Sequence, residues 1–336
     1  MQYSAEPSSR TDYRLSPIGN WLKDRRQKVG IREKYSEWIR VKSGVPQGSV
    51  LGPLLFILFI NDIDIGIISK ISKFADDTKL CREINKWEDA EILRNDLQRL
   101  YQWSLDWQML FNTDKCSVLH MGKKNEKFQY ELGGMSIRDS EEERDLGVIV
   151  HNSAKPSRQC SEAAKKANKV LGMIKRTIVS REKQIILELY KTLVRPHLEY
   201  CVQAWNPYLK QDIDKLERIQ RRATKMIKGC ANLTYEERLI SCGLTTLEKR
   251  RTRGDLIETY KIMTGKDTLP IQKFFTVAED NKTRGHRYKI YKRQAGTWMQ
   301  RFYSSRVVNA WNNLDEETIA TDSVGMFKKR LKKFGY

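Results

Sequence analysis

The chain has 336 residues, 40% hydrophobic and 10% aromatic, which excludes a disordered chain and allows a sizeable core. Its net charge is +20, but residues 1–150 hold 23 of the 62 basic and 23 of the 42 acidic residues. The whole excess therefore lies in residues 151–336, and such a field favours nucleic acid as partner before an anionic membrane.

The start of the chain is polar. Residues 1–17 contain serines and prolines without apolar periodicity, which predicts a poorly ordered leader. There is no hydrophobic signal core, and the six cysteines form no C-x₂-C pair, so we expect a nuclear or cytoplasmic protein that is not secreted. Alternation in residues 25–29 and 36–41 predicts a hairpin.

A loop punctuated by glycines spans residues 44–52, and Pro53 suits the first turn of a helix that follows. Because residues 54–60 are apolar all round, we expect this helix to be buried, and seven residues are too few to span a bilayer. Gly48 either supplies a positive φ or, lacking a Cβ, lets the backbone approach a ligand, to which Gln47 could offer its amide.

Residues 71–81 surround an adjacent carboxylate pair. Extended-structure formers flank Asp76 and Asp77, so the pattern predicts a β-hairpin with both carboxylates at its tip. Carboxylates this close repel one another unless water or a hard cation such as Mg²⁺ screens them. The pair alone therefore indicates either a solvated turn or a metal-binding tip.

Residues 87–109 show helical periodicity, and a strand is predicted at 117–121 after Lys115. Alternation before Gly133-Gly134 predicts a second hairpin. We expect the acidic residues 141–143 to form a solvated loop and residues 146–150 a short buried strand.

From residue 156 the apolar period changes to 3.6, which predicts a helical second half. Helices are expected at 181–194, ended by Pro196, at 211–228, and up to Met263 after a capping box at Thr245. In the 211–228 helix six bases face three acids, which indicates either a solvated face or a surface that follows phosphates. Its basic residues are Lys215, Arg218, Arg221, Arg222, Lys225 and Lys228.

The end of the chain mixes cations and rings. Such interleaving suits single-stranded nucleic acid, because the rings can stack on bases. The residues are Arg284, Arg287, Tyr288, Lys289, Tyr291, Lys292, Arg293, Trp298, Arg301, Tyr303 and Arg306.

Two of these segments together carry a family resemblance. Ser43-Gly44-Val45-Pro46-Gln47-Gly48 and Phe74-Ala75-Asp76-Asp77, in this order, resemble two signature blocks of reverse transcriptases, in the form found in non-LTR (LINE-type, jockey- or CR1-like) retrotransposons. The resemblance implies RNA-directed DNA polymerisation, with an RNA template, a DNA primer, deoxynucleoside triphosphates and Mg²⁺ or Mn²⁺.

The resemblance also implies residue roles. Asp76 and Asp77 would be catalytic metal ligands, and Lys115 would neutralise triphosphate charge or protonate pyrophosphate, unless it is an ordinary exposed lysine. Nucleotide and template would meet Pro46, Gln47, Gly48, Phe74 and Ala75. Leu146 and Gly147 resemble the block that forms the primer-gripping hairpin.

One part of the family pattern is missing. The family has a further catalytic aspartate in a Phe-Ser-Lys-Ala-Phe-Asp-like block well before the Pro-Gln-Gly loop, whereas the only upstream aspartates here are Asp12 and Asp24, outside any apolar strand. We therefore expect part of a longer, or a diverged, polymerase, whose activity alone is in doubt. The alternative is a non-catalytic nucleic-acid-binding protein derived from such an element.

The predicted fold class is α+β. A partial reverse-transcriptase palm of β-hairpins and helices would span residues 18–150 after the leader at 1–17. A basic α-helical thumb and extension would follow at 151–280, and a basic-aromatic region at 281–336. The sequence does not indicate an oligomeric state.

Overall fold

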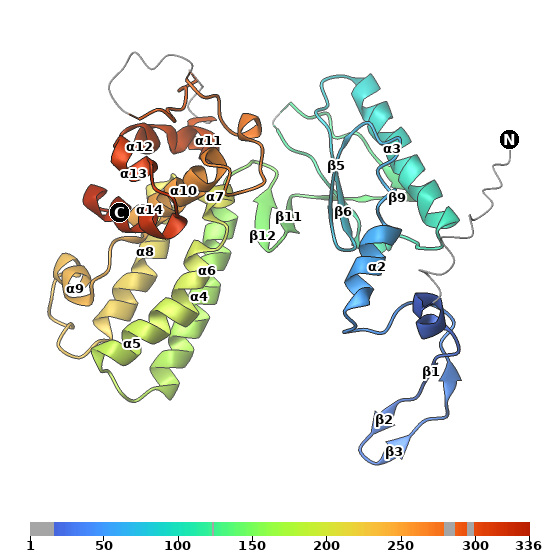
Figure 1. Cartoon of the computed structure of the whole chain (residues 1–336), viewed down its shortest axis with the longest axis horizontal. Helices are drawn as coiled ribbons and strands as arrows, with labels where there is room; N and C mark the ends of the chain where they lie inside the picture. The colour runs from blue at the N-terminus through green and yellow to red at the C-terminus, as the bar shows by residue number, and fades with distance from the viewer. Residues whose placement is uncertain (1–16, 123, 279–285, 294–298) are drawn as a thin grey trace. The chain divides into compact units, whose positions relative to one another are not determined.

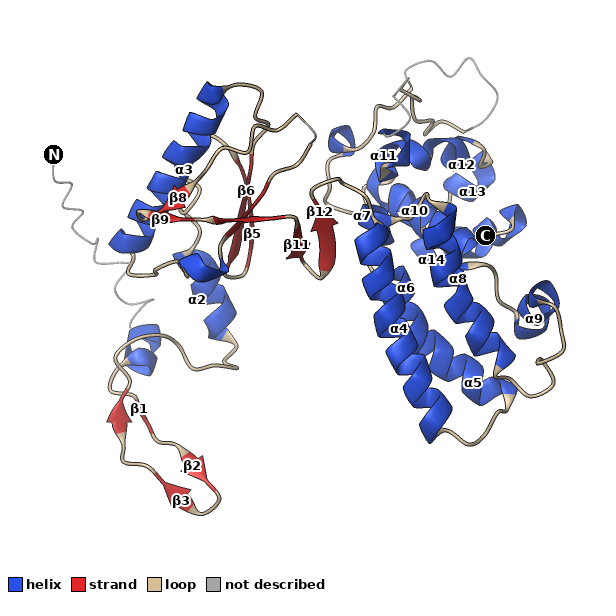
Figure 2. Cartoon of the chain, turned by 180° about the vertical axis from the view of Figure 1, so that it is seen from behind, coloured by secondary structure: helices blue, strands red, loops and turns tan. Residues whose placement is uncertain are grey.

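The computed structural model describes residues 17–122, 124–278, 286–293 and 299–336 (Figure 1). The predicted leader, apart from Pro17, lies outside the described residues. The chain divides into two compact units, one of residues 1–115 and 128–137 (unit 1) and one of residues 116–127 and 138–336 (unit 2). Both helices and strands are present (Figure 2), which confirms a mixed α and β fold. The domain boundaries given above stay predictions.

Unit 1 combines strand pairs with two main helices. A small core of Ile60, Ile63 and Leu100 joins them. The strands are β1 (Arg26–Gln27), β2 (Gly30–Ile31), β3 (Lys34–Tyr35), β4 (Ile39–Arg40), β5 (Lys70–Phe74), β6 (Asp77–Cys81), β8 (Glu131–Leu132) and β9 (Met135–Ser136). The helical segments are a short helix at residues 17–22, α2 (Leu51–Phe59), α3 (Trp87–Asp106) and the 3₁₀ turn η1 (Thr113–Lys115).

Three local predictions in unit 1 are confirmed and one is wrong. The hairpins at 25–41 and 71–81 form, and Gly133 and Gly134 both take positive φ in the turn between β8 and β9. The prediction that α2 is buried is wrong, because the side chains of Leu54, Ile57 and Leu58 are more than half exposed. An all-apolar helix needs neighbours on every side to be covered, and the described residues cover only one.

The strands of unit 2 lie in two pairs. β7 (Ser117–Leu119) pairs in parallel with β10 (Arg138–Ser140), and β11 (Glu142–Asp145) pairs antiparallel with β12 (Val148–His151). The prediction of a loop at 141–143 is therefore wrong, because residues 142 and 143 are in a strand. The predicted strand at 146–150 forms, but it begins at Val148 because Leu146 and Gly147 form the turn before it.

The rest of unit 2 is helical and encloses two apolar cores. Its helices are α4 (Ser157–Thr177), α5 (Lys183–Leu189), α6 (Arg195–Glu199), α7 (Val202–Trp205), α8 (Lys210–Lys225), α9 (Tyr235–Cys242), α10 (Leu247–Met263), α11 (Tyr303–Arg306), α12 (Val308–Asn312), α13 (Glu316–Ile319) and α14 (Val324–Arg330). Short turns are η2 (Tyr190–Val194, a π-helix), η3 (Ile271–Lys273), η4 (Met299–Arg301) and η5 (Leu331–Phe334).

Two helix ends differ from expectation. Pro196 does not end the helix before it, because it lies at the start of α6, where its missing N–H costs nothing, and the π-helix η2 joins α5 to α6. The cap of α10 is Thr246, whose hydroxyl accepts a hydrogen bond from the Lys249 N–H, rather than Thr245. The predicted end of this helix at Met263 is confirmed.

Helices α4 and α8 run side by side in the same direction (Figure 1). Three hydrogen bonds fix this direction, because their positions increase along both helices. They join Ser157 to Asp212 at 2.5 Å, Ser161 to Lys215 at 2.8 Å, and Asn168 to Arg222 at 2.8 Å. Among the described residues, no helix is both long and apolar enough to cross a membrane.

Candidate functional site

The carboxylate pair lies at the end of the β5–β6 hairpin. Phe74 pairs with Asp77, so Ala75 and Asp76 form the two-residue turn, in which Ala75 has a φ of 50°. A positive φ at the first turn position but not at the second, Asp76, is the type II′ arrangement, which normally favours glycine at the first position. The predicted hairpin is thus confirmed, with Asp76 in the turn itself and Asp77 as the first residue of the returning strand.

The two faces of this hairpin differ. Ile71 and Leu80 are paired and pack against the unit 1 core. Because side chains alternate along a strand, Phe74 and Asp77 lie on the opposite face, and the Phe74 side chain is 63% exposed. The Asp77 carboxylate and the turn therefore face away from the core, and both aspartates are exposed.

A buried carboxylate anchors the base of the hairpin. Asp96 of α3 is 0% exposed and accepts hydrogen bonds from the backbone N–H groups of Ile68 at 3.0 Å and Ser69 at 2.7 Å. Burial alone would raise the pKa of Asp96, but the hydrogen bonds from Ser69 and Ile68 outweigh it and lower the pKa. Asp96 thus fixes the chain just before β5 begins at Lys70.

The hairpin alone gives an incomplete metal site. In the parts of the chain that the structure describes, no three His, Cys, Asp or Glu side chains are grouped as a metal would require. The upstream Asp24 is paired with Arg40 at 2.9 Å, and Asp62 accepts a hydrogen bond from Trp103 Nε1 at 2.9 Å. Asp76 and Asp77 supply the hard oxygen donors that Mg²⁺ prefers, but they do not fit a complete protein cage.

The Pro46-Gln47-Gly48 segment forms a β-turn before α2. The Ser49 N–H donates to the Pro46 carbonyl at 3.2 Å, and Gly48 has a φ of 80°. Positive φ at this third position defines a type II turn, so the backbone itself requires glycine here. A Cβ on Gly48 would also meet no atom within 4 Å, which leaves the side of this turn open and is compatible with close approach of a ligand. Gln47 is exposed.

Lys115 ends the 3₁₀ turn η1 and is exposed. Within the described residues, neither a hydrogen bond nor an ion pair joins Lys115 to Asp76 or Asp77.

Leu146 and Gly147 form the turn of the β11–β12 hairpin, with φ values of 46° and 85°. Positive φ at both positions is a type I′ turn, and leucine disfavours it. The Tyr200 hydroxyl donates to the Leu146 carbonyl at 2.9 Å, and its ring would lie 3.5 Å from a Cβ on Gly147. The hairpin resembling the primer grip is therefore attached at its turn by a tyrosine 54 residues away.

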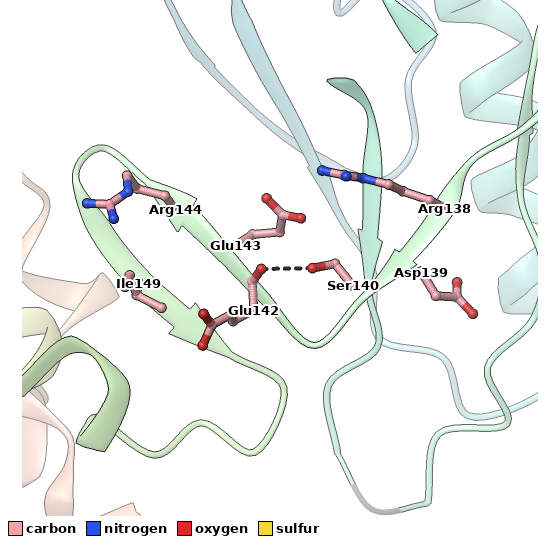
Figure 3. A pocket seen from close by; sticks show the side chains of 7 residues that line it. All are labelled: Arg138, Asp139, Ser140, Glu142, Glu143, Arg144 and Ile149. Atoms are coloured by element: carbon pink, nitrogen blue, oxygen red, sulfur yellow. Dashed lines mark hydrogen bonds between the residues drawn. The ribbon is translucent and has the colours of Figure 1, made fainter. Parts of the chain in front are cut away.

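Further contacts attach the same hairpin to α4. Arg158 makes two hydrogen bonds to the Glu142 carboxylate, at 2.5 and 2.6 Å, and Gln159 accepts from the Ile149 N–H at 2.8 Å. The hydrogen bonds from Arg158 lower the pKa of Glu142. A pocket of about 340 Å³ lies beside these strands (Figure 3). It is lined by Arg138, Asp139, Ser140, Glu142, Glu143, Arg144 and Ile149, and this mixture of charges favours neither anions nor cations.

The basic face of α8 is partly used in internal contacts. Arg221 lies over the Tyr235 ring at 4.3 Å, and Lys228 pairs with Glu182 at 3.6 Å. Lys215 donates to Asp212 at 3.3 Å as well as to Ser161. Two cations of this face, Arg218 and Lys225, are exposed and form no ion pair with a described residue.

Cations continue from α8 onto α4. Arg222 donates to Asn168 of α4 at 2.8 Å, which places its charge at the seam between the helices. By helical spacing, two exposed basic residues, Lys165 three positions before Asn168 and Lys175 seven positions after it, lie on the Asn168 side of α4. The sequence pattern of α8 alone did not reveal this second row.

The basic-aromatic end of the chain is not one exposed surface. Arg284 and Trp298 lie outside the described residues. Tyr303 is buried in the second core of unit 2, and Arg306 forms a two-pronged ion pair with the buried Asp255, at 2.8 and 2.9 Å. The interpretation of Tyr303 and Arg306 as nucleic-acid ligands is therefore wrong, because both serve packing. Tyr291 is 58% exposed.

The known proteins that this chain resembles are reverse transcriptases, that is, RNA-directed DNA polymerases. The family model described as "Reverse transcriptase (RNA-dependent DNA polymerase)" matches residues 6–174. Among curated proteins, the chain is 25% identical over 223 residues to a probable RNA-directed DNA polymerase from transposon X-element and 24% identical over 225 residues to the RNA-directed DNA polymerase from mobile element jockey, both of Drosophila melanogaster. It is 28% identical over 234 residues to a probable RNA-directed DNA polymerase from transposon BS of the same species. Each match covers 63% of this chain and 25% of the relative, so the chain spans about a quarter of their length.

Proposed function

Because the chain belongs to the reverse transcriptase (RNA-dependent DNA polymerase) family, we propose that it contributes part of the catalytic site for RNA-directed DNA polymerisation, in which a DNA primer is extended on an RNA template with deoxynucleoside triphosphates. The observation that carries the proposal is the β5–β6 hairpin, which presents Asp76 in an exposed turn and Asp77 beside it, within the matched residues 6–174. The names of the relatives, all RNA-directed DNA polymerases of mobile elements, support the non-LTR resemblance.

In this proposal the hairpin is one half of the catalytic site. A bound Mg²⁺ or Mn²⁺ would neutralise the triphosphate and activate the primer hydroxyl. Mg²⁺ commonly takes one or two carboxylates together with substrate phosphates, so Asp76, with Asp77 beside it, can hold an ion that arrives with the nucleotide. A further carboxylate, equivalent to the family's upstream aspartate, would be needed for the complete reaction.

The remaining site residues have binding roles in the proposal. The turn at Pro46, Gln47 and Gly48 would contact nucleotide and template together with Phe74 and Ala75. Lys115 would balance triphosphate charge. The turn of the β11–β12 hairpin, Leu146 and Gly147, would contact the primer strand.

Helices α4 and α8 would hold the nucleic-acid backbone, as the thumb of the polymerase, and unit 1 would contribute to its palm. The stripe Lys215, Arg218, Arg222 and Lys225 has the spacing of one helix face, and α4 adds a parallel row beside it. Lysine and arginine that replace condensed counterions on phosphates give affinity that falls steeply with salt. We expect a nuclear or cytoplasmic location and no membrane partner.

The experiment is a templated nucleotide-binding assay that needs no chemistry. The full chain is bound to an RNA template annealed to a DNA primer with a dideoxy end, and dissociation is followed with each nucleotide in turn in Mg²⁺. The nucleotide complementary to the next template base should slow dissociation severalfold, and the other three should not. Asp76→Asn should remove this discrimination, while Asp106→Asn, an exposed aspartate of α3, should keep it.

Two results would contradict the proposal. Equal effects of all four nucleotides would point instead to a non-catalytic nucleic-acid-binding protein derived from such an element. Discrimination that survives Asp76→Asn would remove the hairpin from the nucleotide site.

A further inference from the structure

A second basic surface lies in unit 1, on the hairpin formed by β1 with β4 and β2 with β3 (the ribbon, residues 25–41). Residues 23–42, which include it, carry eight basic and three acidic side chains. Nearly every residue of the ribbon is exposed. In Figures 1 and 2, no helix of the described residues is drawn along either face of its short strands β1 to β4. A two-stranded hairpin is marginally stable alone, so large exposed side chains on it indicate a partner.

Strand register separates the side chains of the ribbon into two faces. Arg26 pairs with Arg40, and Gly30 pairs with Tyr35. A Cβ on Gly30 would lie 2.9 Å from the Tyr35 ring, so this ring covers the glycine. Lys28 lies between β1 and β2, so its ring contacts, rather than strand alternation, place it on the face of Tyr35.

Ring contacts confirm this arrangement. The Lys28 ammonium lies 4.0 Å from the centre of the Tyr35 ring and 4.9 Å from that of Trp38. The Tyr35 and Trp38 side chains are still 67% and 58% exposed, so one lysine holds both rings without covering them. We name this the basic-aromatic face, and it consists of Arg26, Lys28, Tyr35, Trp38 and Arg40.

The charges on this face favour an anion. Arg26 and Arg40 are directly opposite one another, an arrangement that is destabilising between like charges. Asp24 offsets only Arg40, in a pair in which both side chains are mostly exposed, and Arg26 forms no ion pair with a described residue. A phosphate between the two guanidinium groups would relieve the repulsion.

We propose that the basic-aromatic face of the ribbon binds single-stranded nucleic acid, with bases stacking on Tyr35 and Trp38 and phosphates meeting Arg26, Lys28 and Arg40. Exposed rings interleaved with cations are the arrangement that binds single strands without regard to sequence, since every base has a face to stack. This surface does not depend on Asp76, so it can hold or fail independently of the proposed polymerase function.

The other face of the ribbon provides a matched control. Gln27 pairs with Ile39, and Ile31 pairs with Lys34, so Ile31 and Ile39 lie opposite the basic-aromatic face. Their side chains are 71% and 62% exposed. Replacing both tests whether loss of any two large side chains from the ribbon has the same effect.

The experiment measures binding of the full chain to a fluorescent 12-nucleotide single-stranded RNA. All proteins carry Arg218→Gln, Arg222→Gln and Lys225→Gln, so that the α8 surface contributes little. Adding Tyr35→Ala and Trp38→Ala should weaken binding about tenfold or more, because each lost stack is substantial. Tyr35→Phe with Trp38→Phe should bind nearly as the parent does, and Ile31→Ala with Ile39→Ala should also leave binding unchanged.

Cross-linking locates the contact in the otherwise unchanged protein. RNA with 4-thiouridine should cross-link to the peptide that contains Tyr35 and Trp38. Unchanged affinity of the double alanine variant would overturn the proposal, as would cross-links only outside residues 25–41. The proposal would also be overturned if double-stranded RNA bound more tightly than single-stranded RNA through the same rings. A loss of self-association without loss of RNA binding would identify a second copy of the chain as the partner instead.

Discussion

Substitution of Asp96, which is not part of the β5–β6 hairpin, should loosen this candidate catalytic hairpin. Its fully buried carboxylate accepts two backbone hydrogen bonds, from Ile68 and Ser69, immediately before β5. A hydrogen bond to a buried charged acceptor contributes about 1.5–3 kcal/mol. Asp96→Asn keeps one acceptor oxygen, so we expect the free energy of unfolding of unit 1 to fall by about 2 kcal/mol. Asp96→Ala leaves both N–H groups unsatisfied and should cost about 4 kcal/mol.

The assay is urea unfolding combined with hydrogen exchange of residues 68–72. The control is Asp106→Asn, a substitution of an exposed residue on the same helix. Its free energy of unfolding should stay within about 0.5 kcal/mol of that of the native chain. The pH dependence follows from the lowered pKa of Asp96. Its contribution is complete above the unfolded carboxyl pKa of 3.8 and is lost as the pH falls through the lower folded value. The difference in the free energy of unfolding between the native chain and Asp96→Asn should therefore disappear as the pH falls. Equal stability of the two at neutral pH would refute the anchoring role.

Three other predictions follow from the same geometry. Ala75→Gly should stabilise unit 1 by about 1 kcal/mol in urea unfolding, because glycine adopts the positive φ of the turn without strain; a loss of stability would contradict the turn type. Arg306→Ala should destabilise unit 2 by about 3–5 kcal/mol, since it leaves the Asp255 carboxylate buried and unpaired. Burial already raises the pKa of Asp255, so the Arg306→Ala deficit should shrink in thermal unfolding as the pH is lowered; a constant deficit would argue against an ionised Asp255. Primer extension by the chain alone on RNA should give no product that depends on Asp76, because no described third carboxylate joins the hairpin pair, and an Asp76-dependent product would show the site to be complete.

Local chemistry predicted the turns of this fold well. The hairpin at Asp76 and the Gly133-Gly134 turn were predictable because strand formers flank residues that suit tight turns. The second half was predictable as helical from its 3.6 period. The cap of α10 was misplaced by one residue, because two adjacent threonines offer the same hydroxyl and only the backbone decides between them.

What the sequence could not give was the environment of each element. The exposure of Leu54, Ile57 and Leu58 depends on which neighbours cover α2, and periodicity carries no such information. The same limit applies to contacts between distant residues. Nothing near Tyr200 in the sequence indicates that its hydroxyl reaches the Leu146 carbonyl.

The basic surfaces show this limit most clearly. The excess charge of residues 151–336 was correctly located, but the structure shows which cations are already engaged. Arg306 belongs to a buried ion pair, whereas Arg218 remains exposed. Conversely, the ribbon lies in the half whose net charge is zero, so an average over 150 residues hid a locally basic face.

The most direct test of the account asks whether a metal ion binds at the hairpin turn when template, primer and nucleotide are present. Fe²⁺ replaces Mg²⁺ in the complex with a dideoxy-ended primer and the complementary nucleotide, and ascorbate then starts cleavage of the polypeptide near the bound ion. The account predicts cleavage at residues 74–78 that requires the nucleotide, is suppressed by excess Mg²⁺ and is lost in Asp76→Asn. Cleavage that spares this turn, or that persists in Asp76→Asn, would contradict the assignment of the Asp76-Asp77 hairpin as the metal-binding half of the polymerase site.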